Sequence, residues 1–211
     1  AYTGVLSGAG NLVKLGTDTF TLSTNQTFTG SVTIGAGAPG PSATLVDAMS
    51  ELKLSIGSGA SNLLPSTANL IFGGASAPQV TSPTAAQVIA TSLGGGALTM
   101  AGTTGTAAQT FASTTFGAGA ATLNLANNSG SYAMTLNLGA ITRTAGGTVM
   151  VIQPQGTISA TNGVITASGT AGSLLLDANG TAYAALGAYN STQTGSVVTD
   201  WAAKSTTLNF L

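Results

Sequence analysis

Short stretches of strict alternation between apolar and small polar residues recur along this chain, and glycine clusters separate them. The alternation covers residues 19–23, 31–34, 97–100, 121–125 and 134–138. An alternating stretch places its apolar side chains on one face of a β-strand and its Thr, Ser or Asn side chains on the other. The glycine clusters, such as residues 35–40, 94–96 and 117–119, supply the positive-φ turns of a chain that folds back repeatedly. The pattern therefore predicts an all-β fold.

The core of this fold is expected to be thin. Hydrophobic residues make up 43% of the chain, but many are Ala and aromatic residues are only 5%. A core of Val, Leu, Ile and small residues suits stacked sheets. A β-solenoid and a two-sheet β-sandwich both meet this requirement. A solenoid must cap its open coil ends, and a sandwich must protect its edge strands from pairing with other chains.

A competing helical signal lies in residues 41–53, where Leu45, Met49 and Leu52 have helical spacing. The stretch runs into residues 52–56, whose alternation favours a strand. Directly before it, two prolines and a glycine at residues 39–41 disfavour any regular ladder. We therefore expect little helix, and a boundary near residue 40 between a segment 1–40 and a main all-β body 41–211.

Charged residues are rare, which excludes most classes of enzyme. The 211 residues include four Lys or Arg, five Asp or Glu, and no His or Cys. General acid-base catalysis, nucleophile activation and transition-metal binding depend on these groups. A net charge of −1 also offers no basic surface for nucleic acid or anionic lipid, and no apolar run reaches the roughly 18 residues of a membrane helix. We expect no catalytic activity, cofactor, metal, nucleic-acid partner or membrane insertion.

Two charged positions merit a specific expectation. Asp47 and Glu51 are four residues apart and would share one helix face, but no third polar group lies near them in the sequence, so a solvated pair is the favoured interpretation. Arg143 is the single arginine, and we expect it to donate hydrogen bonds to loop carbonyls or to an acid such as Asp177 rather than to bind a ligand.

The first 38 residues carry a more specific pattern. Residues 4–10 read G-V-L-S-G-A-G, residues 12–16 read L-V-K-L-G, residues 20–23 read F-T-L-S, residues 27–30 read T-F-T-G and residues 31–37 read S-V-T-I-G-A-G. This segment closely resembles the autotransporter-associated β-strand repeat, whose signature positions are nearly all matched over residues 4–38. Residues 60–205 resemble, more loosely, regions that flank such repeats in very large secreted bacterial proteins, for example at 63–67, 109–111, 138–143, 146–149 and 200–202.

The resemblance implies an exported, repetitive protein of the bacterial cell surface. Its fold is expected to be a right-handed parallel β-solenoid, and the repeats of such passengers are structural and bring no catalytic residues with them. The resemblance thus favours the solenoid over the sandwich and an extracellular or cell-surface location.

Both ends of the chain are expected to contact other copies. Low charge leaves little repulsion between copies, and apolar terminal strands gain hydrogen bonds by pairing with a neighbour. Trp201, with Tyr183 and Tyr189, is read as part of a cap or contact surface rather than a sugar-stacking patch. The candidate contact residues are Val5, Leu6, Leu12, Val13, Leu15, Trp201, Leu208, Phe210 and Leu211.

The sequence therefore predicts a structural protein that forms a head-to-tail homopolymer, as a filament, sheath or surface layer. The alternative is an adhesin whose Thr- and Asn-rich face binds glycans or another cell surface. A solenoid glycan lyase or hydrolase is a third class, but it needs clustered carboxylates or basic residues that this chain hardly supplies.

Overall fold

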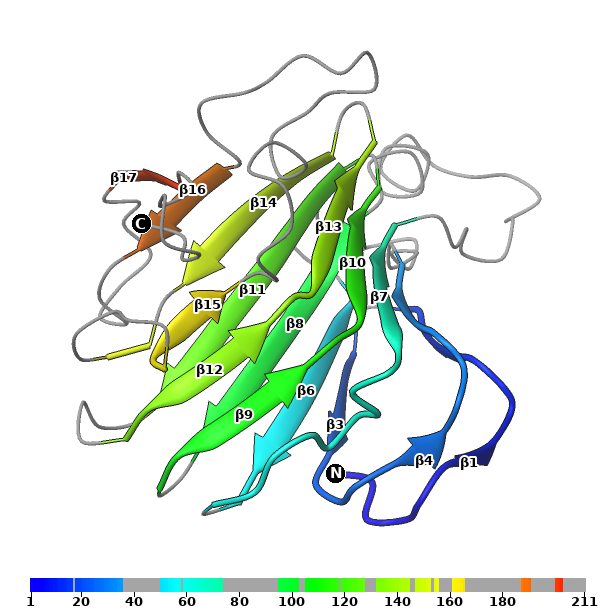
Figure 1. The fold of residues 1–211 in the computed structure, drawn as a ribbon. Coiled ribbons are helices and arrows are strands. Elements are labelled where there is room, and N and C mark those ends of the chain that lie inside the picture. The colour runs from blue at the N-terminus through cyan, green and yellow to red at the C-terminus, as the bar shows by residue number, and fades with distance from the viewer. Residues whose placement is uncertain are drawn as a thin grey trace.

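The described part of the protein is built from β-strands. The computed structural model describes residues 1–16, 18–35, 50–57, 59–73, 95–102, 105–117, 119–127, 132–144, 147–152, 154–155, 161–165, 187–190 and 200–202. Within these ranges the chain forms strands in stacked sheets and no helix (Figure 1), which confirms the all-β prediction.

The described strands are arranged in four sheets. The seven-stranded sheet has the order β17 (Asp200–Ala202), β16 (Gly187–Asn190), β14 (Gly147–Ile152), β11 (Gly119–Asn127), β8 (Gly95–Gly102), β6 (Glu51–Ile56) and β3 (Thr19–Leu22). The five-stranded sheet has the order β13 (Ala140–Arg143), β10 (Ser113–Phe116), β7 (Asn69–Phe72), β5 (Val32–Ile34) and β2 (Leu12–Lys14). The third face carries a three-stranded sheet of β15 (Gly163–Ile165), β12 (Met134–Asn137) and β9 (Ala107–Thr110), and a pair of β1 (Ser7–Gly8) and β4 (Thr27–Phe28).

Neighbouring strands come from successive passes of the chain. All the described strand pairs are parallel except β16 with β17, which is antiparallel. A parallel pair requires a long connection between its two strands, and here the strands of the other sheets provide it. One pass supplies β2 and β3, the next supplies β5 and β6, and later passes supply β7 and β8, then β10 and β11.

The core lies between the sheets and follows from the alternation. In β6, Leu52, Leu54 and Ile56 are buried while Glu51, Lys53 and Ser55 are half-buried on the outer face. Aligned strands repeat this pattern, so like residues stack from pass to pass; Leu52 pairs with Leu98, and Leu54 with Met100. Each fully buried Leu or Met contributes on the order of 1.5–3 kcal/mol.

Side-chain amides join passes where the sheets meet. Gln109 is fully buried, and its Oε1 accepts from the Leu64 amide at 3.0 Å while its Nε2 donates to the Leu64 carbonyl at 3.0 Å. Gln26 also bonds the backbone of an earlier pass. It accepts from the Leu6 amide at 2.7 Å and donates to the Gly4 carbonyl at 3.2 Å. These amides replace peptide groups of the ladder and satisfy buried backbone atoms without using charge.

A continuous ladder also turns the corner after the five-stranded sheet. Gly35 N donates to the Lys14 carbonyl, Gly73 N to the Ile34 carbonyl and Gly117 N to the Phe72 carbonyl, at 3.0, 3.0 and 2.8 Å. A Cβ on Gly117 would lie 2.6 Å from the Phe72 carbonyl oxygen. The close approach of the passes therefore explains the glycine at this corner.

Several local expectations can now be compared with the structure. The alternation at residues 52–56 predicted a strand, and β6 confirms it. Glu51 begins that strand, so the idea that it shares a helix face with Asp47 is wrong; Asp47 and residues 39–41 lie outside the described residues. Strands from both sides of residue 40 pair in the same sheets, β3 with β6 and β5 with β7. Val5 and Leu6 precede the short strand Ser7–Gly8 instead of forming one.

Candidate functional site at the β1, β2 and β3 end of the stack

The strands of the first pass form one end of the stacked sheets. β2 and β3 are terminal strands in their sheets, and β1 is one member of a pair. Along the free side of β3, the described pairing is an isolated parallel bridge between Tyr2 and Leu22, in which Tyr2 N donates to the Thr21 carbonyl at 2.7 Å. Edges of this kind offer unpaired N–H and C=O groups to another strand.

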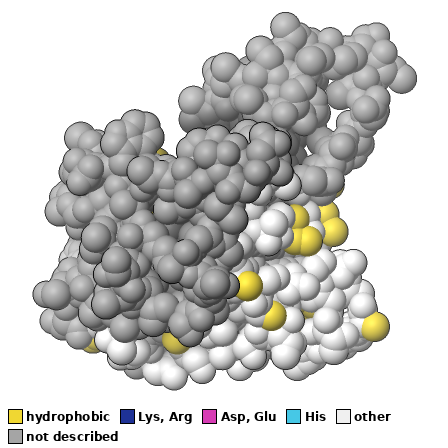
Figure 2. Space-filling view, turned by 45° about the horizontal axis from the view of Figure 1, so that its top comes forward, with side chains coloured by type: hydrophobic (Ala, Val, Ile, Leu, Met, Phe, Trp, Pro, Cys, Tyr) yellow, Lys and Arg dark blue, Asp and Glu magenta, His cyan; other side chains and the backbone are white. Residues whose placement is uncertain are grey.

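Exposed apolar side chains gather at this end. Among the described residues, the large hydrophobic side chains most exposed to solvent are Tyr2 at 37%, Val5 at 54% and Val13 at 49%. All three belong to the first pass. In the view of Figure 2, apolar side chains on the described surface form one small group and otherwise occur singly.

Beneath these side chains the core is incompletely covered. Leu6, Leu12 and Phe20 are partly buried and pack against the core, whereas their counterparts in later passes, such as Val32 and Leu52, are 0% exposed. Register places Leu12 beside Val32 and Phe20 beside Leu52. The core therefore continues to this end without a layer of side chains over it.

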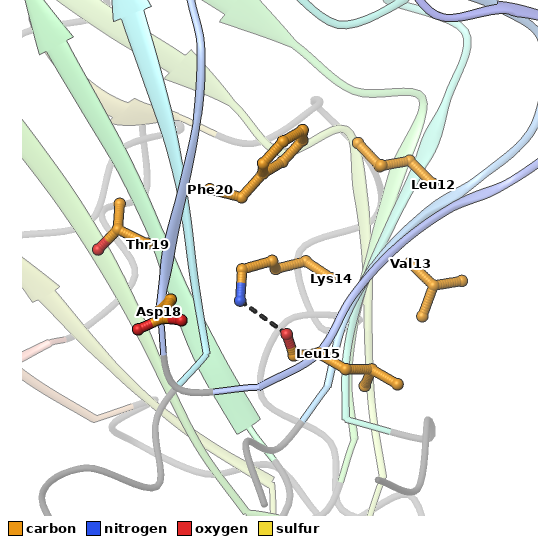
Figure 3. Close-up of a pocket in the computed structure, with 7 residues that line it drawn as sticks. All are labelled: Leu12, Val13, Lys14, Leu15, Asp18, Thr19 and Phe20. Atoms are coloured by element: carbon orange, nitrogen blue, oxygen red, sulfur yellow. Dashed lines mark hydrogen bonds between the residues drawn. The ribbon is translucent and has the colours of Figure 1, made fainter. Parts of the chain in front are cut away.

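Two hollows mark the uncovered layer. The larger, of about 390 Å³, lies between β2 and β3 (Figure 3), and the smaller, of about 220 Å³, lies between β1 and β2. Figure 3 shows Leu12, Lys14 and Phe20 directed into the space between the two strands, while Val13 points to the opposite side. The residues that line the larger hollow are Leu12, Val13, Lys14, Leu15, Asp18, Thr19 and Phe20.

Lys14 closes one side of the larger hollow. Its ammonium donates to the Leu15 carbonyl at 2.8 Å, the Gly16 carbonyl at 3.0 Å and Ser50 Oγ at 3.2 Å, and the residue is only 8% exposed. Burial lowers the pKa of Lys14 from 10.5, and the negative charges of Asp18 and Glu51 oppose that shift. The ammonium is thus a bound structural group that ties the first pass to the second.

Glu51 lies on the outer face of the seven-stranded sheet, across three passes of the chain. Its carboxylate accepts hydrogen bonds from Thr99 Oγ1 at 2.6 Å and from Thr19 Oγ1. Thr19 and Glu51 are direct cross-strand partners, and Thr99 comes from the third strand, β8. A carboxylate held by two hydroxyls joins β3, β6 and β8.

The predicted contact residues divide among three places. Val5, Leu6, Leu12, Val13 and Leu15 all belong to the end described above. Trp201 lies in β17, the opposite edge strand of the seven-stranded sheet, paired with Ala188. Leu208, Phe210 and Leu211 lie outside the described residues. Arg143 Nε donates to the carbonyl of Gly147, so the partner is a backbone carbonyl as expected, but it belongs to the first residue of β14 and not to a loop. Asp177 lies outside the described residues.

Sequence reasoning missed Tyr2, Lys14, Phe20 and Glu51 as members of this end. One signal was present: Lys14 occupies an inward position of the alternation that begins at Leu12, where an apolar residue is the rule. The hydrogen bonds of Glu51 reach residues tens of positions away, so no local sequence pattern predicts them.

The described residues contain no group of three or more Asp or Glu side chains placed to hold a metal ion. No helix of a length and hydropathy suited to crossing a membrane occurs in the described part of the chain. Comparisons with models of protein families, with curated proteins and with solved structures found no match.

Proposed function

We propose that this chain is an extracellular structural protein, a β-solenoid that assembles head to tail with copies of itself into a filament, sheath or surface layer. The observation that carries the proposal is the combination found at one end of the stack. There the edge strands β1, β2 and β3, the exposed apolar residues and the two hollows occur together.

The solenoid part of the proposal is supported by the strand pairing. Successive passes add parallel strands in the same order to the sheets, as the coils of a solenoid do. The right-handed form and the extracellular location are proposed from the resemblance of residues 4–38 to the autotransporter-associated repeat.

The assembly part is supported by the chemistry of the exposed end. A strand added beside β2 or β3 would gain backbone hydrogen bonds, and its apolar side chains would enter the hollows. Covering the exposed part of a side chain such as Val13, which is 49% exposed, contributes roughly half of the about 1.5–3 kcal/mol of a full burial. The surface that accepts this strand differs from the surface that supplies it, so the contact is heterologous and propagates into an open polymer.

The donor is proposed from sequence at the opposite end of the chain. Leu208 and Phe210 alternate with polar residues in the last six residues, and Leu211 follows them. Trp201, in the edge strand β17, is proposed as a second apolar contact residue on that side. With a net charge of −1 and only nine charged side chains, copies meet little electrostatic repulsion.

The test replaces the two most exposed apolar residues of the accepting end. A Val5→Lys/Val13→Lys variant is compared with the wild type and with Thr106→Lys, which places a charge on an exposed residue away from this end. Electron microscopy and sedimentation measure polymers, and circular dichroism and the melting temperature check folding. We expect filaments from the wild type and Thr106→Lys, and a folded, soluble monomer from the double variant. Filaments of unchanged diameter from the double variant would refute the proposed contact.

A further inference from the structure

The outer face of the five-stranded sheet consists of two continuous rows of uncharged side chains. The branched row contains Val13, Thr33, Ile71, Thr115 and Thr142, one from each strand. The short row lies two residues earlier on each strand and contains Asn11, Ser31, Asn69, Ser113 and Ala140. Every residue of both rows is exposed or half-buried.

Charge distinguishes this face from its neighbour. The outer face of the seven-stranded sheet carries Glu51 and Lys53, which are two residues apart on β6. On the five-stranded sheet, Lys14 and Arg143 lie in a different row, in register with the inward-facing Ile34, Phe72 and Phe116. The branched and short rows therefore meet an approaching surface without electrostatic repulsion.

Hydrogen bonds within the short row reduce the cost of covering it. Asn11 Oδ1 accepts from the Ser31 amide at 2.8 Å, and Ser113 Oγ donates to Asn69 Oδ1 at 2.8 Å. Polar groups already paired along the row lose less on burial than unpaired ones. The face combines β-branched methyl groups with polar groups, of which the Asn11 and Asn69 side-chain oxygens and the Ser113 hydroxyl have partners within the short row.

We propose that this face is a lateral contact between two copies of the chain, related by a two-fold axis parallel to the stacking direction. Such an axis reverses the strand direction and places the branched row of one copy over the short row of the other. Each pass faces the same pass of its neighbour, so that Thr115 of one copy lies over Ser113 of the other. Where the short row carries Ser31, Ser113 or Ala140, the branched side chain opposite has room to interdigitate, as in paired β-sheets of the steric-zipper type. At Asn11 and Asn69 the facing side chains are of similar length.

The same operation preserves the direction of the stack, and this links the lateral contact to the proposed head-to-tail assembly, on which it rests. Two filaments joined in this way run with equal polarity. Five strands spaced about 4.8 Å apart and about four residues long cover only roughly 300 Å² per copy, compared with about 800 Å² per partner in a stable complex. One such contact is weak, but many along a filament act together.

Charge placed in the middle of the branched row tests the contact in filaments. Thr33→Lys/Thr115→Lys is compared with Thr106→Lys/Thr148→Lys, which adds the same charge at exposed positions outside the two rows. We expect the first variant to form single filaments, and the control and the wild type to form bundles or layers in electron micrographs. Bundles of unchanged width from the first variant would overturn the proposal. So would glycan binding that this variant loses while its filaments still associate.

Cross-linking tests the geometry, because the chain contains no cysteine of its own. Ser113→Cys and Thr115→Cys are oxidised separately and as a mixture. The two-fold arrangement predicts several-fold more disulfide dimer in the mixture than in either variant alone. Equal yields in all three samples would overturn it. If the wild type makes no filaments, the proposed function fails, and the cysteine mixture at high protein concentration still decides the lateral contact.

Discussion

Phe72 and Phe116 stack on one another as direct cross-strand partners in the five-stranded sheet, with ring centroids 5.4 Å apart and an angle of 10° between the ring planes. Both rings are 1% exposed. With Phe111, they are the largest fully buried side chains of the described core, which is otherwise mostly aliphatic.

Replacing either ring is expected to destabilise the fold strongly. Phe116→Ala should lower the free energy of unfolding by about 3–5 kcal/mol, because it removes buried area and leaves a cavity. Chemical denaturation measures the loss, with Thr115→Ala on the outer face as the control. The double-mutant cycle with Phe72→Ala should give a coupling of about 0.5–1.5 kcal/mol. Additive losses would show that the stacking itself contributes nothing.

Gln109→Ala tests the role of side-chain amides in joining passes. The substitution leaves the Leu64 amide and carbonyl without the partners that Gln109 supplies. We expect a loss of about 1–3 kcal/mol per buried polar group left unpaired. Asn124→Ala, at a half-buried outer position of β11, is the matched control. A loss no larger than that of the control would mean that water or a shift of the backbone replaces the amide.

Gly139→Ala and Gly57→Ala form a second matched pair. Gly139 has φ of 63°, and a Cβ there would be driven into the Ala112 carbonyl. A left-handed conformation alone costs a non-glycine residue about 1–2 kcal/mol, and the clash adds to it. At Gly57 no atom lies within 4 Å of the added Cβ, so Gly57→Ala should change stability by less than about 1 kcal/mol. Melting temperatures measure both, and equal effects would contradict this account of Gly139, which lies between β12 and β13.

Because Lys14 is buried, we expect the free energy of unfolding to depend on pH in the alkaline range. Burial lowers its pKa in the folded protein below 10.5, so in the window just below 10.5 the unfolded chain binds more protons than the folded one. Stability then rises with pH through that window. Lys14→Met should remove this rise, which appears as the difference between the unfolding free energies of wild type and variant at several pH values. A difference that stays constant or reverses sign would contradict the role of burial.

The sequence predicted the strands whose alternation is local. Residues 52–56 form most of β6, and residues 121–125 lie within β11, because one buried and one outer face impose a period of two on the residues themselves. Short strands such as β1 escape this rule, since Ser7 and Gly8 are too few to show a period.

The residues of the candidate contact end, formed by β1, β2 and β3, were predicted only in part. Val5, Val13 and Leu15 were recognised because they are apolar and near a terminus. Parallel pairing joins residues that are tens of positions apart, so no local pattern announces that Lys14 reaches Ser50 or that Glu51 joins Thr19 to Thr99.

At the corner after the five-stranded sheet, the backbone ladder is independent of the length of the connections between strands. The ladder from Lys14 through Ile34 to Phe72 is unbroken, although β10 reaches β11 by a very short connection while β7 reaches β8 through a much longer one. Lengthening a connection costs only about 0.6 kcal/mol per doubling, whereas shifting the ladder would misplace every buried side chain. Connections at this corner are therefore natural grafting sites, where a peptide epitope or a reporter domain can be displayed at a fixed spacing without redesigning the scaffold.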